Sequence, residues 1–374
     1  MKIGHIELIK KINRELVLET IRNEQPISRA KISRNLGISR STVSSIVDQL
    51  IEKKFVVEQG YGESTKEGGR RAIQLGFNPA SAYGIGVEIK SEKVTVCIAD
   101  LDGNVVFTKS VAHARELYDI RDAIQKCILE STISVEQIIA IGFCIPGITD
   151  SAEGIVIDSP ELHWENIHLT KYMKDFFDKP IFINNNVNCL ALGERWLGNA
   201  KNIDDFAYVL IEKGIGAAFM ANGSLVQGKN FMAGEIGYFA FESDLQNMER
   251  NKLSEFGTFD KKASLLAFEK IPTPFNELIQ NYQMLHGETR LLVDQFIQTL
   301  CLGLANIISL LNPEKLIIGG EAGRQLMLLK PVIIEQIKNI TPIEFAIEKD
   351  SMKDNIGALG IMSFAFSQVK DTVI

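Results

Sequence analysis

Residues 84–106 read GIGVEIKSEKVTVCIADLDGNVV, two runs of alternating apolar and polar side chains with a turn signal at Asp102-Gly103. Such alternation is typical of β-strands with one buried face, and Asp-Gly favours a hairpin turn. A helical pattern near 116–132 follows, then an apolar run at Ile138–Ile145 and another short strand at Pro180–Ile183. This order of strands and helices predicts a mixed α/β fold.

The second half of the chain continues this mixed pattern. A strand is expected at Phe206–Ile211, and the next hairpin has Asn222-Gly223 at its turn. A helical pattern covers most of 290–311, and KLIIGGEAG at 315–323 reads as a short buried strand that ends in glycines. These elements are too many for one compact lobe. Several strands are followed by glycine turns, which is where ligands bind in α/β folds. We therefore expect two lobes around a cleft.

The first part of the chain has a helical pattern that differs from the rest. Pro26 ends a first helix, whose apolar residues share one face. Ser28 is expected to cap a second helix, Gly37 to form a sharp turn, and Ser39 to cap a third helix. The third helix directs Val43, Ile46, Val47 and Leu50 inward, and the apolar residues of the first are Ile6, Ile9, Ile12, Leu16 and Ile21. The pattern predicts a helix-turn-helix, whose second helix enters the DNA major groove.

A short hairpin is predicted after the third helix. Strands at Phe55–Glu58 and Ala72–Leu75 flank the loop GYGESTKEGGRR at 60–71, which resembles the wing of a winged helix. Glycines at the tip allow two arginines to reach DNA. The residues predicted to contact DNA lie on the outward face of the third helix, at the start of the second, and in the wing: Ser28, Arg29, Arg40, Ser41, Thr42, Ser44, Ser45, Arg70 and Arg71.

Charge is distributed unevenly along the chain. The 374 residues carry 40 Lys and Arg against 47 Asp and Glu, a net charge of -7. Residues 1–79 hold 14 basic and 9 acidic side chains, so this segment carries +5 and the remainder -12. A basic segment attached to an acidic protein points to a polyanionic partner. We interpret 1–79 as a DNA-binding head; the alternative is a three-helix domain that docks onto another protein.

Composition also bears on location and cysteine chemistry. No run of about 18 uncharged apolar residues is present, so we expect no membrane span. The N-terminus lacks the apolar core of a secretion signal, which indicates a cytoplasmic protein. The five cysteines are isolated, without metal-ligand spacing, and are expected to be buried reduced thiols. Trp164 and Trp196 are interpreted as core or lobe-interface residues.

Five short motifs occur in the order that they have in the ROK family, a group of bacterial sugar kinases and sugar-responsive repressors. They are Pro146-Gly147, Asn185 before a helix, Gly214-Ile215-Gly216, Ala233–Gly237, and Leu311–Glu314 with Gly319-Gly320. The chain resembles this family over nearly its whole length, and its winged head resembles the repressor branch. The resemblance implies a two-lobed actin/hexokinase-like (ribonuclease H-like) ATPase domain, assembled as dimers or tetramers.

This resemblance suggests a division of the chain. We expect a winged helix-turn-helix at 1–79, a first lobe at 80–184 that a C-terminal helix at 356–374 completes, and a second lobe at 185–355. The second lobe is expected to carry the sugar site and the dimer surface.

The sequence departs from the kinases of this family where they transfer phosphate. Asn186 stands in place of the catalytic Asp, and a carboxamide does not accept a proton at neutral pH. Lys90 and Ser91 replace two glycines of the first phosphate loop, and Glu212-Lys213 replace Gly-Thr of the second. Side chains there block backbone amides from meeting phosphate. We expect no ATP and no catalytic residue; the alternative is an active ROK sugar kinase with an accessory DNA-binding head.

Family members also hold a structural zinc, through the His of a GEIGH motif and downstream cysteines. Here Tyr238 replaces the histidine and residues 239–270 contain no Cys or His, so we expect no zinc, as in xylose-repressor-type members. The resemblance implies that Asn185, Glu235 and Asp260 match positions that contact sugar hydroxyls in relatives. Asn186 and Tyr238, at the positions of the catalytic Asp and the His, still donate and accept hydrogen bonds, so we assign all five residues to the sugar site. We predict a sugar-responsive transcriptional repressor of carbohydrate-utilisation genes, whose partners are operator DNA, a sugar effector and further copies of the chain.

Overall fold

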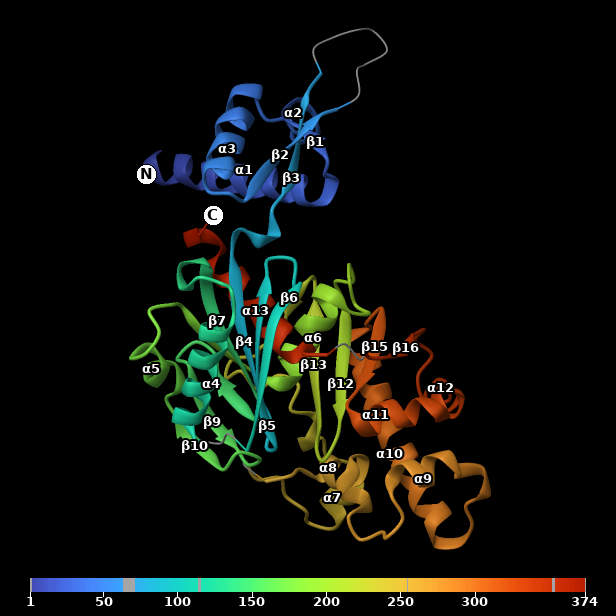
Figure 1. The fold of residues 1–374 in the computed structure, drawn as a ribbon. Coiled ribbons are helices and arrows are strands. Elements are labelled where there is room, and N and C mark those ends of the chain that lie inside the picture. The colour runs from blue at the N-terminus through green and yellow to red at the C-terminus, as the bar shows by residue number, and fades with distance from the viewer. Residues whose placement is uncertain (1, 63–70, 114–115, 254, 352–353, 374) are drawn as a thin grey trace.

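The computed structural model describes residues 2–62, 71–113, 116–253, 255–351 and 354–373 (Figure 1). A small helical head lies at one end of a larger body, and the body consists of two lobes built on separate sheets. The chain forms the head first, then the first lobe and the second lobe, and returns to the first lobe with its last helix.

The head is a winged helix-turn-helix. Its elements are α1 (Lys2–Glu24), β1 (Ile27–Ser28), α2 (Arg29–Leu36), α3 (Arg40–Glu52), β2 (Val56–Tyr61) and β3 (Ile73–Phe77), with the sheet order β1-β3-β2. Ser28 Oγ accepts a hydrogen bond from Lys31 N at 3.3 Å, and Ser39 Oγ accepts one from Thr42 N at 3.2 Å. Gly37 ends α2 at φ +67°, a conformation that glycine adopts without strain. The predicted caps and turn are therefore confirmed.

Two features of the head differ from the sequence expectation. In α1, Val17 and Ile21 are buried whereas Ile9, Ile12 and Leu16 stay exposed, and the side chain of Ile6 lies outside the described residues. The spacing predicts a face but not how far along the helix its partners extend. Strand β1 pairs with β3 and was not expected, because two residues are too few to show a period.

The first lobe contains a sheet of order β11-β7-β4-β5-β6. Its strands are β4 (Tyr83–Ile89), β5 (Lys93–Asp100), β6 (Val105–Ala112), β7 (Ile138–Ile145) and β11 (Ile181–Asn185). Helices α4 (Leu117–Glu130) and α5 (Leu169–Lys174) and a small sheet of β8 (Ile148–Asp150), β9 (Ile155–Ser159) and β10 (Trp164–Ile167) complete it. Trp164 is buried in the core of this lobe, as the sequence predicts.

The second lobe contains a sheet of order β14-β13-β12-β15-β16. Its strands are β12 (Phe206–Ile211), β13 (Ile215–Ala221), β14 (Ser224–Leu225), β15 (Lys315–Gly319) and β16 (Ile347–Lys349). Its helices are α7 (Glu242–Gln246), α8 (Thr258–Ala263), α9 (Phe275–Gln280), α10 (Gly287–Leu311), α11 (Glu321–Leu326) and α12 (Lys330–Lys338). By length and composition α10 could cross a membrane, but its buried face, with Phe296, Leu300 and Leu304, forms part of the core of this lobe.

Two helices cross where the lobes meet. Helix α6 (Asn186–Leu197) follows β11, and α13 (Ile356–Val373) packs against α6, β4 and β7. Glycines allow the two backbones to touch: a Cβ on Gly193 would lie 2.5 Å from Ile356 O, and one on Gly360 would collide with Cys189 O. This contact leaves no room for any side chain at either glycine, so α6 and α13 form one tightly packed unit.

Candidate DNA-binding face and sugar site

The outward face of α3 is the candidate DNA-binding surface. Arg40, Ser41, Thr42 and Ser45 are exposed and Ser44 is half-buried, while the opposite face is buried in the head. Ser39 Oγ lies 3.0 Å from Ser41 Oγ and 2.8 Å from Thr42 Oγ1, so these hydroxyls form one polar group at the start of the helix. Short hydroxyls beside an arginine suit close approach to phosphates and base edges.

Other predicted DNA contacts have partners within the head. Arg29 Nη2 binds Asp48 Oδ1 at 2.8 Å and Nη1 binds Glu58 Oε1 at 3.4 Å, so this side chain ties α2 to α3 and β2. Ser28 Oγ is engaged in capping α2. Arg71 is exposed at the end of the wing, and Arg70 lies outside the described residues.

The candidate sugar site begins where β11 meets α6. Asn185 is buried at the end of the strand and caps the helix, its Oδ1 accepting a hydrogen bond from Asn188 N at 2.8 Å. Among the described residues, no group accepts a hydrogen bond from Asn185 Nδ2, so the amide nitrogen keeps its donors for a ligand. Asn186 is half-buried, and its Oδ1 accepts from Val187 N at 3.0 Å. Two side-chain amides therefore lie at the start of α6, where the first backbone N–H groups of a helix have no partner within the helix.

Strand β13 brings the other predicted sugar residues to the same place. Gly216 faces Val187 of α6, and the backbone at Ala217 contacts Gly234, next to Glu235. Ile215 N donates to Asp260 Oδ1 at 2.7 Å. The start of α6, the 234–238 segment and the start of α8 thus surround one end of this strand. Residues far apart in the sequence meet around a glycine-containing strand, because its small residues let three segments approach closely.

Asp260 already uses both carboxylate oxygens. Its Oδ2 accepts from Gly257 N at 2.8 Å in addition to the Ile215 bond, and the side chain is buried. Gly237 lies directly against this carboxylate, with no room for a side chain. Asp260 therefore anchors α8, β13 and the 234–238 segment to one another. Tyr238 lies in the same segment, and its backbone oxygen accepts from Asn251 Nδ2 at 2.6 Å.

Glu235 has a strongly shifted acidity. Burial, and secondarily the nearby Asp260 carboxylate, raise its pKa to about 7. A carboxyl group near neutrality both donates and accepts hydrogen bonds around this pH, which suits a ligand rich in hydroxyls. Perturbed groups of this kind gather at functional sites.

This shift predicts how stability depends on pH. An unfolded Glu has a pKa of about 4.3, so between pH 4.5 and 7 the folded protein holds an extra proton and its stability falls as pH rises. Glu235→Gln removes this loss, and we expect the variant to gain about 1 to 2 kcal/mol over the native protein on going from pH 5 to pH 8. Urea unfolding at both pH values measures the gain. If the difference in unfolding free energy between the variant and the native protein is the same at pH 5 and pH 8, the predicted effect of Glu235 is wrong.

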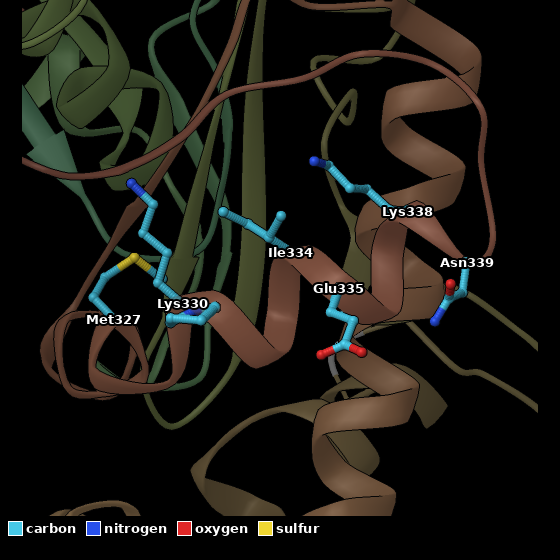
Figure 2. A pocket seen from close by; sticks show the side chains of 7 residues that line it. Met327, Lys330, Ile334, Glu335, Lys338 and Asn339 are labelled. Atoms are coloured by element: carbon cyan, nitrogen blue, oxygen red, sulfur yellow. The ribbon is translucent and has the colours of Figure 1, made fainter.

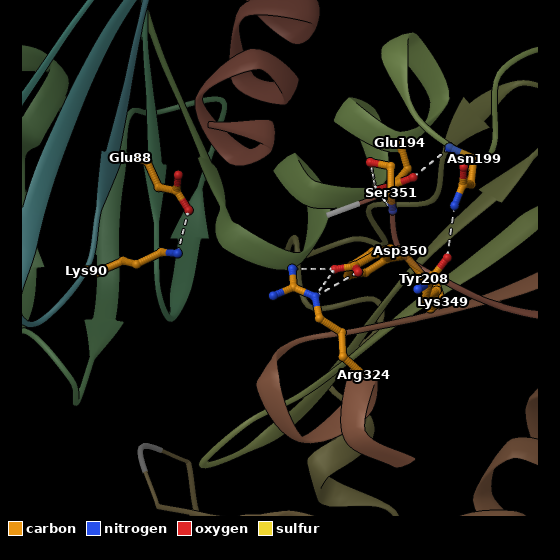
Figure 3. A network of polar contacts seen from close by, with 9 residues as sticks. All are labelled: Glu88, Lys90, Glu194, Asn199, Tyr208, Arg324, Lys349, Asp350 and Ser351. Carbon is orange, nitrogen blue, oxygen red and sulfur yellow. Dashed lines mark hydrogen bonds and ion pairs between the residues drawn. The ribbon is translucent and has the colours of Figure 1, made fainter. Parts of the chain in front are cut away.

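Charged side chains occupy the segments that the sequence analysis compares with the phosphate loops of the kinases. Lys90 Nζ lies 3.1 Å from Glu88 Oε1 (Figure 3), and Ser91 N donates to Glu161 Oε1 at 3.2 Å. Burial alone would lower the pKa of Lys90, but the Glu88 carboxylate, with Glu212 as a smaller contribution, raises it. Burial raises the pKa of Glu212, and Lys90 opposes that rise. A lysine with carboxylates near it therefore lies at this position.

The sequence did not reveal a buried polar network at the start of α13 (Figure 3). Arg324 binds Asp350 through Nε at 2.8 Å and Nη2 at 2.7 Å, and the Tyr208 hydroxyl donates to Asp350 at 3.4 Å. Glu194, fully buried, accepts from Ser351 N at 2.9 Å and Ser351 Oγ at 2.6 Å. The network holds the segment before α13 against α6 and the second sheet. Its one signal in the sequence was a carboxylate within the apolar stretch CLALGERWL.

Two surface depressions lie apart from these residues. One, of about 730 Å³, is lined along α11 and α12 by Met327, Lys330, Pro331, Ile334, Glu335, Lys338 and Asn339 (Figure 2). The other, of about 320 Å³, adjoins the start of α11. None of the five predicted sugar residues lines either depression, so we do not place the ligand there.

A basic winged helix-turn-helix on a two-lobed actin/hexokinase-like body defines a class of DNA-binding regulator, and this fold is the one that the sequence predicts. The chain belongs to the ROK family, whose sequence profile matches residues 84–368. Residues 12–59 match the MarR family.

Known proteins similar to this chain include several repressors. The xylose repressor of Caldicellulosiruptor bescii is 30% identical over 98% of this chain and 98% of its own length. The xylose repressor of Bacillus subtilis is 28% identical over the full length of both chains. The N-acetylglucosamine repressor of Escherichia coli O157:H7 is 28% identical over 89% of this chain and 86% of its own.

Solved structures confirm the fold. A ROK family transcriptional regulator described as a homologue of the Escherichia coli MLC protein has a TM-score of 0.79 at 20% identity, covering 98% of this chain and 99% of its own. The ROK hexokinase of Thermus thermophilus has a TM-score of 0.64 at 19% identity over 77% of this chain and 99% of its own. The second match covers less of this chain than the first.

Proposed function

We propose that this protein is a sugar-responsive transcriptional repressor of carbohydrate-utilisation genes. The observation that carries the proposal is the likeness to the xylose repressor of Caldicellulosiruptor bescii, which extends over 98% of this chain and so includes the head and both lobes. The outward face of α3, with Arg40 and its neighbouring hydroxyls, supports a role in DNA binding. The grouping of Asn185 and Glu235 around β13 supports a hydroxyl-rich ligand.

In this proposal DNA binding and sugar binding both depend on one equilibrium between two arrangements of the lobes. Two heads of a homodimer, or of a tetramer, place their α3 helices in successive major grooves of an operator in the cytoplasm. A sugar bound between the lobes stabilises one arrangement of the lobes over another. It changes DNA affinity only by its differential affinity for the two arrangements. The xylose repressors among the relatives favour a pentose as the effector.

Fluorescence anisotropy with upstream DNA and a panel of sugars tests the proposal. We expect DNA binding that weakens with salt and that one class of sugar, among pentoses, hexoses and N-acetylhexosamines, changes further. Thermal unfolding identifies that sugar, because a ligand of the native state raises the midpoint. Absence of binding at low salt to every upstream fragment would refute the proposal.

We further propose that the cleft binds sugar without phosphorylating it and without a zinc ion. Asn186 at the position of the catalytic base supports the first statement, together with the Lys90–Glu88 pair in the phosphate region. Tyr238 in place of the zinc-ligating His, and the absence of Cys and His from residues 239–270, support the second.

The kinase alternative has a direct test. Purified protein with Mg²⁺, ATP and sugar is expected to release no more ADP than a reaction without protein. Asn186→Asp restores a carboxylate but is expected to remain inactive, because Lys90 and Ser91 still occupy the phosphate loop. A coupled ADP-release assay measures both proteins. A phosphorylated sugar from the native protein would establish the kinase instead.

A further inference from the structure

The turn between β5 and β6, residues 100–104, is held by the head on one side. Arg22 of α1 donates to Asp102 Oδ1 through Nε at 2.9 Å and Nη2 at 2.5 Å, and to Leu101 O at 2.8 Å. The same guanidinium lies 5.1 Å from the ring centre of Phe77. Leu101 packs against the hydrophobic core of the head. The head therefore docks on the first lobe through this turn.

The other side of the same turn rests on the end of α6. Gly103 has φ +78°, and a Cβ there would lie 2.6 Å from Leu197 Cδ1 and 3.1 Å from Trp196 Cη2. The Trp196 ring packs edge-on against Phe366 of α13, with 6.0 Å between ring centres. A displacement of the C-terminal end of α6 would thus meet the turn directly, since no free space separates them.

The turn itself is internally braced. Asp100, which is buried, accepts from Asp102 N and Asn104 N at 2.9 Å each, and from Asn104 Nδ2 at 3.0 Å. Because three hydrogen bonds to one carboxylate hold this short turn, we expect it to move as a rigid unit when one side of it is displaced.

Helix α6 connects this turn to the candidate sugar site. Its cap, Asn185, and its first residue, Asn186, belong to that site, and Trp196 and Leu197 end the helix at Gly103. Twelve residues of helix span about 18 Å. One rigid element therefore has the candidate ligand at its first turn and the support of the head at its last.

We propose that α6 communicates sugar occupancy to the DNA-binding head through the turn at 100–104, with Arg22 and Asp102 as the positioning residues of this coupling. The inference rests on the proposed function. Arg22 and Asp102 have half-exposed side chains, so their pair is of the modest strength that a ligand-driven shift can overcome. Coupling of this kind needs an element with two arrangements that both sites influence, and the docked head supplies it.

Asp102→Ala tests the coupling with operator DNA and the effector sugar. We expect the sugar-induced change in operator affinity to shrink at least about 5-fold, while sugar binding to the DNA-free protein is retained. Asp122→Ala is the matched control, because it breaks an ion pair with Arg121 on the first lobe at a site that takes no part in the proposed relay. The double exchange Arg22→Asp with Asp102→Arg is expected to restore much of the response that either single change loses.

A second pair of variants tests the other side of the turn. Gly103→Ala adds a methyl group against Leu197 and is expected to reduce the sugar response. Gly287→Ala, at φ +59° with open space around it, controls for backbone strain alone. If the native protein responds to sugar and the Asp102 and Gly103 variants respond equally, the coupling route is wrong and the repressor function stands. If no sugar changes operator binding by the native protein, the proposed function itself fails.

Discussion

Replacing Arg40 by alanine is expected to weaken operator binding about 10- to 100-fold, the most direct consequence of the proposed DNA-binding face. Arg40 is exposed at the start of α3, beside the clustered side-chain hydroxyls of Ser39, Ser41 and Thr42. A guanidinium there pairs with a phosphate or with the edge of a guanine, and its loss removes a charged contact without disturbing the core of the head. Anisotropy titrations at several salt concentrations measure the effect.

The salt series separates two explanations of a weaker complex. A lost phosphate contact lowers the salt dependence by about one counterion and weakens all sequences alike, whereas a lost base contact relaxes specificity at one position. Arg250→Ala makes the same change of charge on an exposed part of the second lobe and is expected to leave binding nearly unchanged. Native affinity in the Arg40 variant at every salt concentration would show that α3 does not present this residue to DNA.

Replacing Asn185 by serine is expected to weaken sugar binding about 10- to 100-fold and to abolish the sugar effect on DNA binding at ordinary sugar concentrations. Serine caps a helix about as well as asparagine, so a hydrogen bond from Asn188 N is retained while the amide proposed to bind the sugar is lost. Calorimetric titration with the effector sugar measures affinity, and thermal unfolding without sugar measures stability.

Asn185→Ala serves as the comparison. It removes the cap as well as the amide, so we expect a further loss of about 1 kcal/mol of stability together with the same loss of sugar affinity. If the serine variant keeps both stability and sugar affinity while the alanine variant loses both, Asn185 acts only as a helix cap. Native affinity in the serine variant would remove it from the site.

Local sequence accounts for the elements and their ends. Ser28, Gly37 and Ser39 delimit the helices of the head as expected, and β7 and β12 have the bounds that their apolar runs predict. Asn222-Gly223 forms the turn between β13 and β14, both residues at positive φ. These features depend on side chains within a few residues of one another, so a single sequence contains the information that determines them.

The sequence proposes the residues of the candidate site but not their arrangement in space. Asn185, Glu235 and Asp260 come from three segments, and their meeting point, the start of β13, follows from how the segments pack. The assignment of Asp260 to the sugar stays a prediction, and the structure adds that each of its oxygens accepts a hydrogen bond from a backbone amide. That use of a carboxylate depends on which amides other segments bring to it.

By itself, then, the sequence determined that this protein has a basic helix-turn-helix head and an α/β body of two lobes, and the loss of the kinase phosphate loops stays a prediction. The tertiary structure decided which half of α1 is buried, that Arg29 ties the head together, and that Arg22 joins the head to the first lobe through Asp102. The physical reason is the range of the interactions. Caps, turns and periodicity act between neighbours in the chain, whereas docking and ion pairing depend on groups that only the folded chain brings within contact distance.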